Sequence, residues 1–236
     1  MKSIALASLA TLTLAQSAQW PSVAPSSGQS VRVLGNQSPA TQKGDFWYSS
    51  NLSIDESPLP AQYVAPTPEK AVEIKTYPSV RRAQVKSQAL WFEDIFGTSR
   101  AFWKLFDHIK TRDIAMTSPV EMNWHGIHTG FFGGFDADSW EMSFLYRTPS
   151  LGPQGQFGDV TVYDTEELTV LSIGVSDNFT VTSVAKAVDV LQKLLAQQTT
   201  WVQSGDPRSL GYNSPMHKTQ WQEVQIPIRL ASAASL

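Results

Sequence analysis

The segment Ala101-Phe-Trp-Lys-Leu-Phe-Asp-His-Ile109, followed after four residues by Ile114-Ala-Met-Thr-Ser-Pro-Val-Glu-Met122, decides the fold. In its first part, apolar residues recur every three to four positions, which is typical of one face of a helix. We therefore expect an amphipathic helix over residues 99–110. The second part has a strand pattern, so the chain is predicted to return to a sheet over residues 114–122.

The same order of elements occurs twice along the chain. In each half, two predicted strands precede an amphipathic helix and further strand-like sequence follows it. A Ser-Pro step comes after each helix, at Ser118-Pro119 and at Ser214-Pro215. We predict an α+β domain, a curved antiparallel sheet or distorted barrel of about eight strands with two helices, built from two ββαββ pseudo-repeats. The remaining predicted elements are strands over 71–77, 80–85, 140–146, 159–163, 168–173 and 223–228 and a helix over 183–197.

The N-terminus resembles a targeting segment. Residues 1–18 combine a basic start, an apolar run and small residues, as a secretory signal peptide does. The apolar run is shorter than the roughly 20 residues that span a bilayer, so no transmembrane segment is predicted. Sequons at Asn51 and Asn178 are consistent with a secreted glycoprotein. We expect the protein to be extracellular or in the secretory pathway.

The rest of the 236 residues divides into three parts. Residues 19–68 are rich in Ser, Pro and Gln and are predicted to form an arm or linker. This arm is either a disordered stalk or is packed on the domain through Phe46 and Trp47. Residues 69–230 have the length of one domain, and residues 231–236 are predicted to be a frayed tail.

The composition excludes several kinds of function. The chain has no cysteine, which excludes disulfides, thiolate metal sites and a cysteine nucleophile. Its net charge of −3 and the lack of a basic stripe argue against a nucleic-acid partner. Nucleophile-elbow, phosphate-loop and dinucleotide motifs are absent from the sequence, so no catalytic residue is predicted, although enzymatic activity stays open.

Five stretches match the motifs of one family in the family's order. The matching stretches are Val72-Glu-Ile-Lys-Thr-Tyr77, the helix 101–109, Ile114-Ala-Met-Thr-Ser-Pro-Val120, Leu168-Thr-Val-Leu171 and Gly211-Tyr-Asn-Ser-Pro215 with Glu223-Val224. The chain therefore resembles the SOUL haem-binding protein family over nearly all of residues 72–228. It departs from the family at His108, where a Tyr is usual, and at Thr76, where some members have a proposed axial histidine. The link between the helix and the Met-Thr-Ser-Pro motif is also shorter than usual.

The resemblance implies non-covalent binding of haem or another porphyrin in an exposed apolar cleft beside the first helix. His217 is the first choice for a contact, because imidazole can ligate iron or bind a propionate. Arg100 and Lys104 could pair with propionates at the rim, although charges on a helix more often only solvate it. The full set of predicted binding residues is His217, Met216, Arg100, Lys104, Phe102 and His108. No metal site is predicted.

Three functions remain open from the sequence. The first is a secreted, non-catalytic carrier or scavenger of haem or another tetrapyrrole. The second is an interaction or effector-binding module for another amphipathic ligand or a peptide, because the fold also resembles bacterial effector-binding domains built from the same repeat. The third is an enzyme that modifies or degrades haem, for which the pairing of His217 with His108 is the sole indication.

Overall fold

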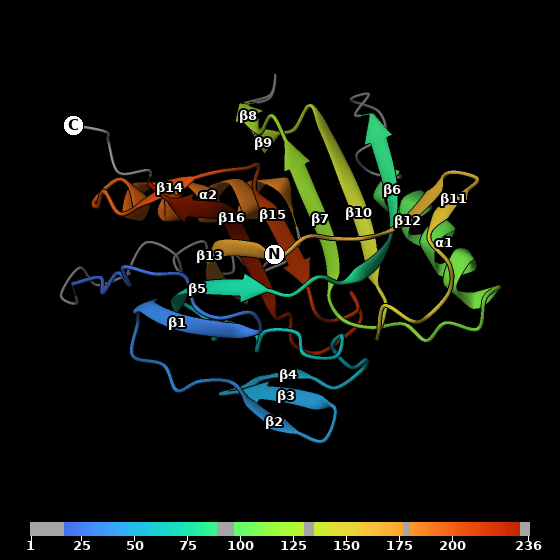
Figure 1. Cartoon of the computed structure of the whole chain (residues 1–236), viewed down its shortest axis with the longest axis horizontal. Coiled ribbons are helices and arrows are strands. Elements are labelled where there is room, and N and C mark those ends of the chain that lie inside the picture. The colour runs from blue at the N-terminus through green and yellow to red at the C-terminus, as the bar shows by residue number, and fades with distance from the viewer. Residues whose placement is uncertain (1–16, 89–96, 130–134, 177–179, 232–236) are drawn as a thin grey trace, which may run out of the picture.

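The computed structural model describes residues 17–88, 97–129, 135–176 and 180–231. They form the predicted α+β fold, with one large antiparallel sheet and two helices (Figure 1). The sheet has eleven strands among the described residues, in the order β1-β5-β13-β16-β15-β7-β10-β6-β12-β11, with β14 also paired to β16. Its end strands β1 and β11 are not paired with each other, so within the described residues the sheet is open and not a closed barrel.

The two predicted pseudo-repeats account for eight of these strands. The first consists of β5 (Val72–Tyr77), β6 (Arg81–Gln88), α1 (Gly97–Lys110), β7 (Val120–His125) and β10 (Ser139–Leu145). The second consists of β12 (Val160–Asp164), β13 (Leu168–Val175), α2 (Val181–Leu195), β15 (Arg208–Gly211) and β16 (Gln222–Leu230). The other strands are β1 (Gln29–Leu34), β2 (Thr41–Lys43), β3 (Phe46–Ser49), β4 (Leu52–Ile54), β8 (His128–Thr129), β9 (Phe135–Asp136), β11 (Gly155–Phe157) and β14 (Trp201–Gln203).

The segment between α1 and β7 differs from the prediction. Residues 114–119 are not part of a strand, and β7 begins only at Val120. Pro119 has no N–H to donate to a neighbouring strand, and Ser118 instead donates its N–H to the carbonyl of Pro58 at 2.9 Å. The two Ser-Pro steps are also not equivalent, since the first precedes β7 whereas Ser214-Pro215 follows β15.

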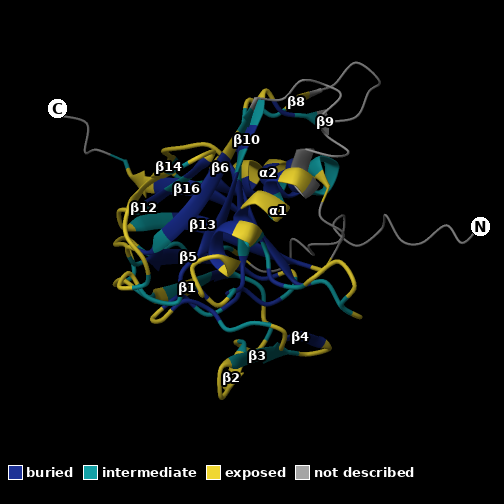
Figure 2. Ribbon diagram, turned by 90° about the vertical axis from the view of Figure 1, so that its right-hand side faces the viewer, coloured by how far each residue is buried: buried dark blue, intermediate teal, exposed yellow. Residues whose placement is uncertain are grey.

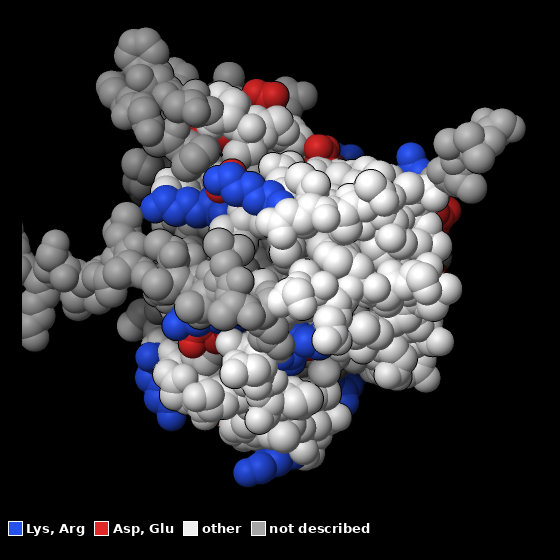
Figure 3. Space-filling view, turned by 90° about the vertical axis from the view of Figure 1, so that its left-hand side faces the viewer, with Lys and Arg blue, Asp and Glu red and all other residues white. Residues whose placement is uncertain are grey.

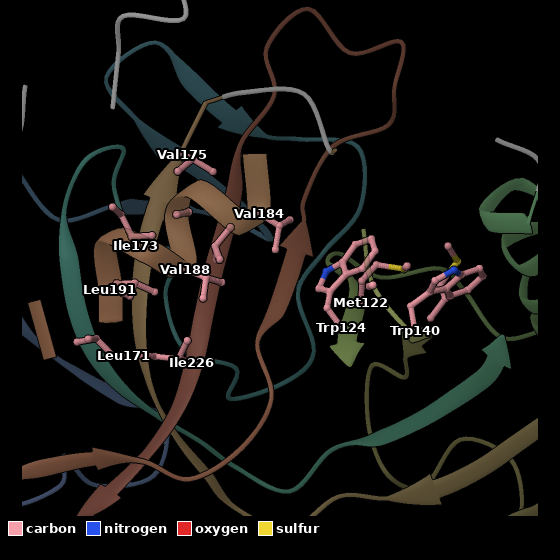
Figure 4. Packing of buried hydrophobic residues seen from close by; sticks show 14 of the residues in the cluster. Met122, Trp124, Trp140, Leu171, Ile173, Val175, Val184, Val188, Leu191 and Ile226 are labelled. Atoms are coloured by element: carbon pink, nitrogen blue, oxygen red, sulfur yellow. The ribbon is translucent and has the colours of Figure 1, made fainter. Parts of the chain in front are cut away.

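One face of the sheet is apolar and is covered by the helices. Successive side chains of a strand point to opposite faces, so the strands alternate between this face and the other. Figure 4 shows Val184, Val188 and Leu191 of α2 facing Leu171 of β13 and Ile226 of β16. Helix α2 begins at a capping box, in which Thr180 and Ser183 satisfy each other's backbone N–H groups. Burial of each such aliphatic side chain contributes about 1.5–3 kcal/mol to folding.

The opposite face of the sheet carries buried polar and charged side chains, and the arm covers it. Leu52, Ile54, Leu59 and Val64 of the arm are buried in a second apolar cluster with residues of β5, β10, β13 and β15. At Gly174 of β13 the arm comes so close that an added Cβ would collide with the carbonyl oxygens of residues 67 and 68. The buried strands therefore lie between the helices and the arm (Figure 2).

The structure distinguishes between the two alternatives for the arm. Strand β1 of the arm pairs with β5 and so extends the main sheet, and strands β2, β3 and β4 form a small sheet of their own. Trp47 on β3 is half-buried against the second apolar cluster, as the packed alternative predicted. Residues 1–16 of the predicted signal peptide lie outside the described residues. Asn178 and residues 232–236 of the predicted tail also lie outside them.

Two features of the molecule bear on its partners. On the face shown in Figure 3, Lys and Arg side chains occur in small separate groups between uncharged areas. Neither helix within the described part of the chain has the length and hydropathy needed to cross a membrane.

Candidate functional site

Helix α1 presents an exposed aromatic surface. Phe102, Trp103 and Phe106 pack on one another, with ring centroids 5.7 Å apart for Phe102–Trp103 and 5.6 Å apart for Trp103–Phe106. Phe102 also meets Phe144 of β10 edge to face at 5.1 Å, which anchors this group to the core. Trp103 is 59% exposed, although it is the largest side chain of the group. We call these three residues the α1 aromatic surface.

Two basic residues adjoin the α1 aromatic surface. Arg100 is exposed and makes no ion pair with any residue that the structure describes. Lys104 is exposed as well and forms a 2.5 Å ion pair with Asp159, which is itself 69% exposed. An exposed pair of this kind contributes little to stability and is easily exchanged for another anion. Both side chains therefore remain accessible to an acidic group that binds beside the aromatic rings.

His108, on the same helix, is buried and already has a partner. Its Nε2 lies 3.0 Å from the hydroxyl of Tyr146, and its ring lies 5.4 Å from that of Phe157. Burial, with a smaller contribution from the Arg112 charge, lowers the pKa of His108 from 6.5 to about 4. The imidazole is thus neutral at pH 7, and its hydrogen bond to Tyr146 would have to break before Nε2 could ligate iron.

His217 and Met216 lie in a different place. Nε2 of His217 forms a 3.0 Å contact with the Asp55 carboxylate of the arm, and Nδ1 lies 2.7 Å from the Thr219 carbonyl. Met216 is 93% exposed. The structure therefore brings Arg100, Phe102, Lys104 and His108 together on α1. It places His217 against the arm and leaves the neighbouring Met216 almost fully exposed. His108 and His217 form their hydrogen bonds with different partners, so nothing in the structure pairs them.

Sequence reasoning missed Trp103 as a site residue. The periodicity of the helix selects Phe102, Leu105, Phe106 and Ile109 as the buried face, and Trp103 falls outside it. A large aromatic residue next to the apolar stripe was the available indication, because exposed aromatic patches often mark binding surfaces. For metals, the described residues include no cluster of three or more His, Asp or Glu side chains that could hold an ion.

A cluster of buried charged side chains lies on the polar face of the sheet, around Glu121 of β7. Arg82 Nη2 lies 2.8 Å from one carboxylate oxygen of Glu121, and Arg208 Nη1 lies 3.4 Å from the other. The hydroxyl of Tyr63, from the arm, donates to the same carboxylate at 2.5 Å. Burial opposes ionisation of Glu121, but the two guanidinium groups outweigh it and keep its pKa below the ordinary value. We call Tyr63, Tyr77, Arg82, Glu121 and Arg208 the Glu121 cluster.

A buried ion pair lies beside the Glu121 cluster and holds the arm. Lys75 and Glu223 are fully buried, and Lys75 Nζ lies 2.8 Å from both carboxylate oxygens of Glu223. The same Nζ donates to the Ala65 carbonyl at 2.7 Å, and Glu223 accepts the N–H of Thr67 at 2.8 Å. Burial opposes ionisation of Glu223, but Lys75 and several hydrogen bonds lower its pKa to about 2. The ion pair therefore fixes two backbone groups of the arm to the sheet.

The two most specific sequence motifs meet under the arm. Ser118 of Met-Thr-Ser-Pro donates its hydroxyl to the Tyr212 carbonyl of Tyr-Asn-Ser-Pro at 2.8 Å. Asn213 donates to the Ser53 carbonyl of the arm at 2.8 Å, and Ser214 donates to the Glu56 carboxylate. In this structure the motif residues contact the arm and one another, and α1 is the element that carries the exposed aromatic rings.

A family model described as SOUL heme-binding protein matches residues 60–227. The chain belongs to this family. The match includes α1, both motifs and the last part of the arm, and so confirms the resemblance drawn from the motifs. A comparison with curated proteins found no match.

Solved structures of low sequence identity share the fold. An uncharacterized conserved protein from Listeria innocua is 12% identical, with 69% of this chain and 94% of that one covered and a TM-score of 0.51. EcmrR in its complex with DNA is 10% identical, with 68% of this chain and 57% of that one covered and a TM-score of 0.51. At these identities the likeness concerns the fold alone.

The α1 aromatic surface fits the group that the family name implies. A tetrapyrrole offers a flat apolar macrocycle and acidic side chains, and α1 offers exposed aromatic rings next to Arg100 and Lys104. The described residues near α1 supply no free imidazole, because His108 is bound to Tyr146. The residues present therefore suit a macrocycle held by apolar contact and charge.

Proposed function

We propose that the protein binds haem or another tetrapyrrole non-covalently at the α1 aromatic surface, as a carrier and not as a catalyst. The observation that supports this most is Trp103, a large aromatic side chain that is 59% exposed in contact with two further aromatic rings. An exposed apolar patch of this kind on a folded domain is a common mark of a ligand surface. The family to which the chain belongs is described as heme-binding.

In this proposal each side chain of α1 has a defined part. Phe102 and Phe106 form the base of the surface, because both are half-buried against the core. Trp103 stacks on the macrocycle. Arg100 and Lys104 pair with the propionates, and Lys104 exchanges its exposed partner Asp159 for the ligand.

Titration with haem, followed by the Soret band, tests the proposal. Covering about 100 Å² of the Trp103 ring is worth about 2.5 kcal/mol at ~25 cal/mol per Å². The Trp103→Ala variant should therefore bind haem on the order of 50-fold more weakly. Because Trp103 is largely exposed, its replacement should leave the free energy of unfolding nearly unchanged.

The matched controls are Met216→Ala and His217→Ala, which change the other predicted contacts. Both should bind haem as the unchanged protein does if the site lies on α1. Loss of binding in His217→Ala with full binding in Trp103→Ala would place the site against the arm and overturn this assignment. Absence of any Soret change with the folded protein at micromolar haem would overturn the proposed function itself.

We also infer that the chain enters the secretory pathway and carries a glycan on Asn51. The sequence of residues 1–18 supports the first part. The exposed position of Asn51 in the turn between β3 and β4 supports the second. Expression in a eukaryotic secretory host should give a product that starts near residue 19 and becomes smaller on treatment with an endoglycosidase. An Asn51→Gln variant that loses no mass relative to the unchanged protein would contradict the glycan.

A further inference from the structure

A cavity of about 370 Å³ opens on the polar face of the sheet, away from α1. Its floor is formed by the Glu121 cluster, and its lining also includes Glu166 and Glu167, which follow β12, and Asp206, which precedes β15. A volume of this size is in the range of small-molecule sites. The cavity is separate from the proposed tetrapyrrole surface, because strand alternation directs Arg82 away from the face on which α1 packs.

The floor of the cavity has unused hydrogen-bond donors. Arg82 is 6% exposed and Arg208 is 4% exposed, yet Nε of Arg82 and Nη2 of Arg208 have no hydrogen-bond partner among the described residues. Buried donors without a partner are costly and uncommon in native proteins. The charges of the floor also do not cancel, since two guanidinium groups face the single carboxylate of Glu121. A bound anion would satisfy both the donors and the excess charge.

The mouth of the cavity has the opposite charge. Glu166 and Glu167 are exposed and form no ion pair or hydrogen bond with the residues that the structure describes. Asp206 is exposed as well and is bound to His125 at 2.7 Å. A ligand that fits both ends therefore has an acidic group directed inward and a basic group at the mouth.

Tyr63 is positioned to admit such a ligand. The two unpartnered nitrogens are covered, so a lining side chain must rotate before an acid group can reach them. Tyr63 lines this cavity and also a second cavity of about 380 Å³ under the small sheet of the arm. In the complex proposed below, the Tyr63 ring would turn toward the second cavity and leave the guanidinium nitrogens of Arg82 and Arg208 open to the acid group.

We propose that this cavity binds a small zwitterionic organic acid, with the carboxylate held by Arg82 and Arg208 and the basic group facing Glu166 and Glu167. The site is independent of the tetrapyrrole surface and would remain if haem did not bind. The aromatic ring of Tyr77 suits an apolar spacer between the two charged groups.

Calorimetric titration of the full chain with four probes of similar shape tests the proposal. The probes are 4-(aminomethyl)benzoate, benzoate, benzylamine and benzamide. We expect the zwitterion to bind most tightly, benzoate about tenfold more weakly, and benzylamine and benzamide not measurably. Binding of benzylamine in preference to benzoate would reverse the assigned polarity, and equal binding of benzamide and benzoate would show that no acid is recognised. No binding by any of the four probes would overturn the site.

Two variants separate the two ends of the site. Glu166→Gln with Glu167→Gln changes exposed residues only, and should reduce binding of the zwitterion to the level of benzoate without affecting benzoate. Arg208→Gln should abolish binding of both acids, while haem titration stays unchanged. If Arg208→Gln does not fold, the comparison of benzoate with benzamide on the unchanged protein still decides whether the floor recognises an acid.

Discussion

Replacement of Lys75 by Met should destabilise the protein strongly, because it leaves the Glu223 carboxylate buried without its counter-charge. Folding lowers the pKa of the Glu223 carboxyl from its ordinary value of 4.5 to about 2. At about 1.4 kcal/mol per pKa unit, this difference corresponds to roughly 3 kcal/mol of stability at neutral pH. Breaking a buried ion pair by removing one partner costs about 3–5 kcal/mol in general, which agrees.

Urea unfolding followed by tryptophan fluorescence measures this effect. Since the pKa of Glu223 is lowered on folding, its contribution is complete above pH 4.5 and is lost as the pH falls toward 2. The unchanged protein should therefore lose stability across this interval, whereas Lys75→Met should lose less. In the double variant Lys75→Met, Glu223→Gln, which removes both charges, stability should partly return. A cost below about 1 kcal/mol for Lys75→Met at pH 7 would refute the assignment of the ion pair as a main attachment of the arm.

Two further predictions concern packing and pH. Gly174→Ala should lower the free energy of unfolding by about 1–3 kcal/mol, as overpacking does. Because the new methyl group displaces the backbone of the arm, thermolysin should also cleave faster within residues 52–68. An unchanged rate of cleavage would contradict the close approach of the arm to Gly174. The pKa of His108 falls from 6.5 to about 4 on folding, so the stability that the neutral imidazole contributes is complete above pH 6.5 and lost as the pH falls toward 4. As the pH is lowered from 6.5 to 4, the midpoint of unfolding should decrease for the unchanged protein and should decrease less for His108→Gln. Equal decreases in the two proteins would exclude His108 as the cause.

Much of the fold could be predicted from the periodicity of the sequence. Within residues 99–122 the apolar pattern changes from the helical period of 3.6 to the strand period of 2. This local change predicted α1 and the repeat correctly, because apolar side chains determine which face of each element is buried. The strand predicted over 114–122 was wrong over residues 114–119, because tertiary hydrogen bonds hold that segment to Pro58 and Tyr212. Such contacts between residues far apart in sequence leave no periodic pattern.

The candidate sites were harder to predict than the fold. Arg100, Phe102 and Lys104 could be proposed as binding residues because they belong to a helix that is visible in the sequence. The cluster around Glu121 was not found, since it joins side chains from the arm, β6, β7 and β15 that are separated by up to 145 positions, from Tyr63 to Arg208. In a sequence, a single charged residue within a strand pattern is normally interpreted as solvent-exposed unless its partner across the sheet is known.

The attachment of the arm has a practical consequence for anyone who shortens this chain. The family match begins at residue 60, and the domain boundary suggested by composition lies near residue 69. An expression clone cut at either place would lose Leu52, Ile54 and Leu59 and would expose the apolar surface that they cover. A cut at 69 would also remove Thr67 and the Ala65 carbonyl, two partners of the Lys75–Glu223 pair. Aggregation of such a fragment would reflect the missing cover and say nothing about the ligand.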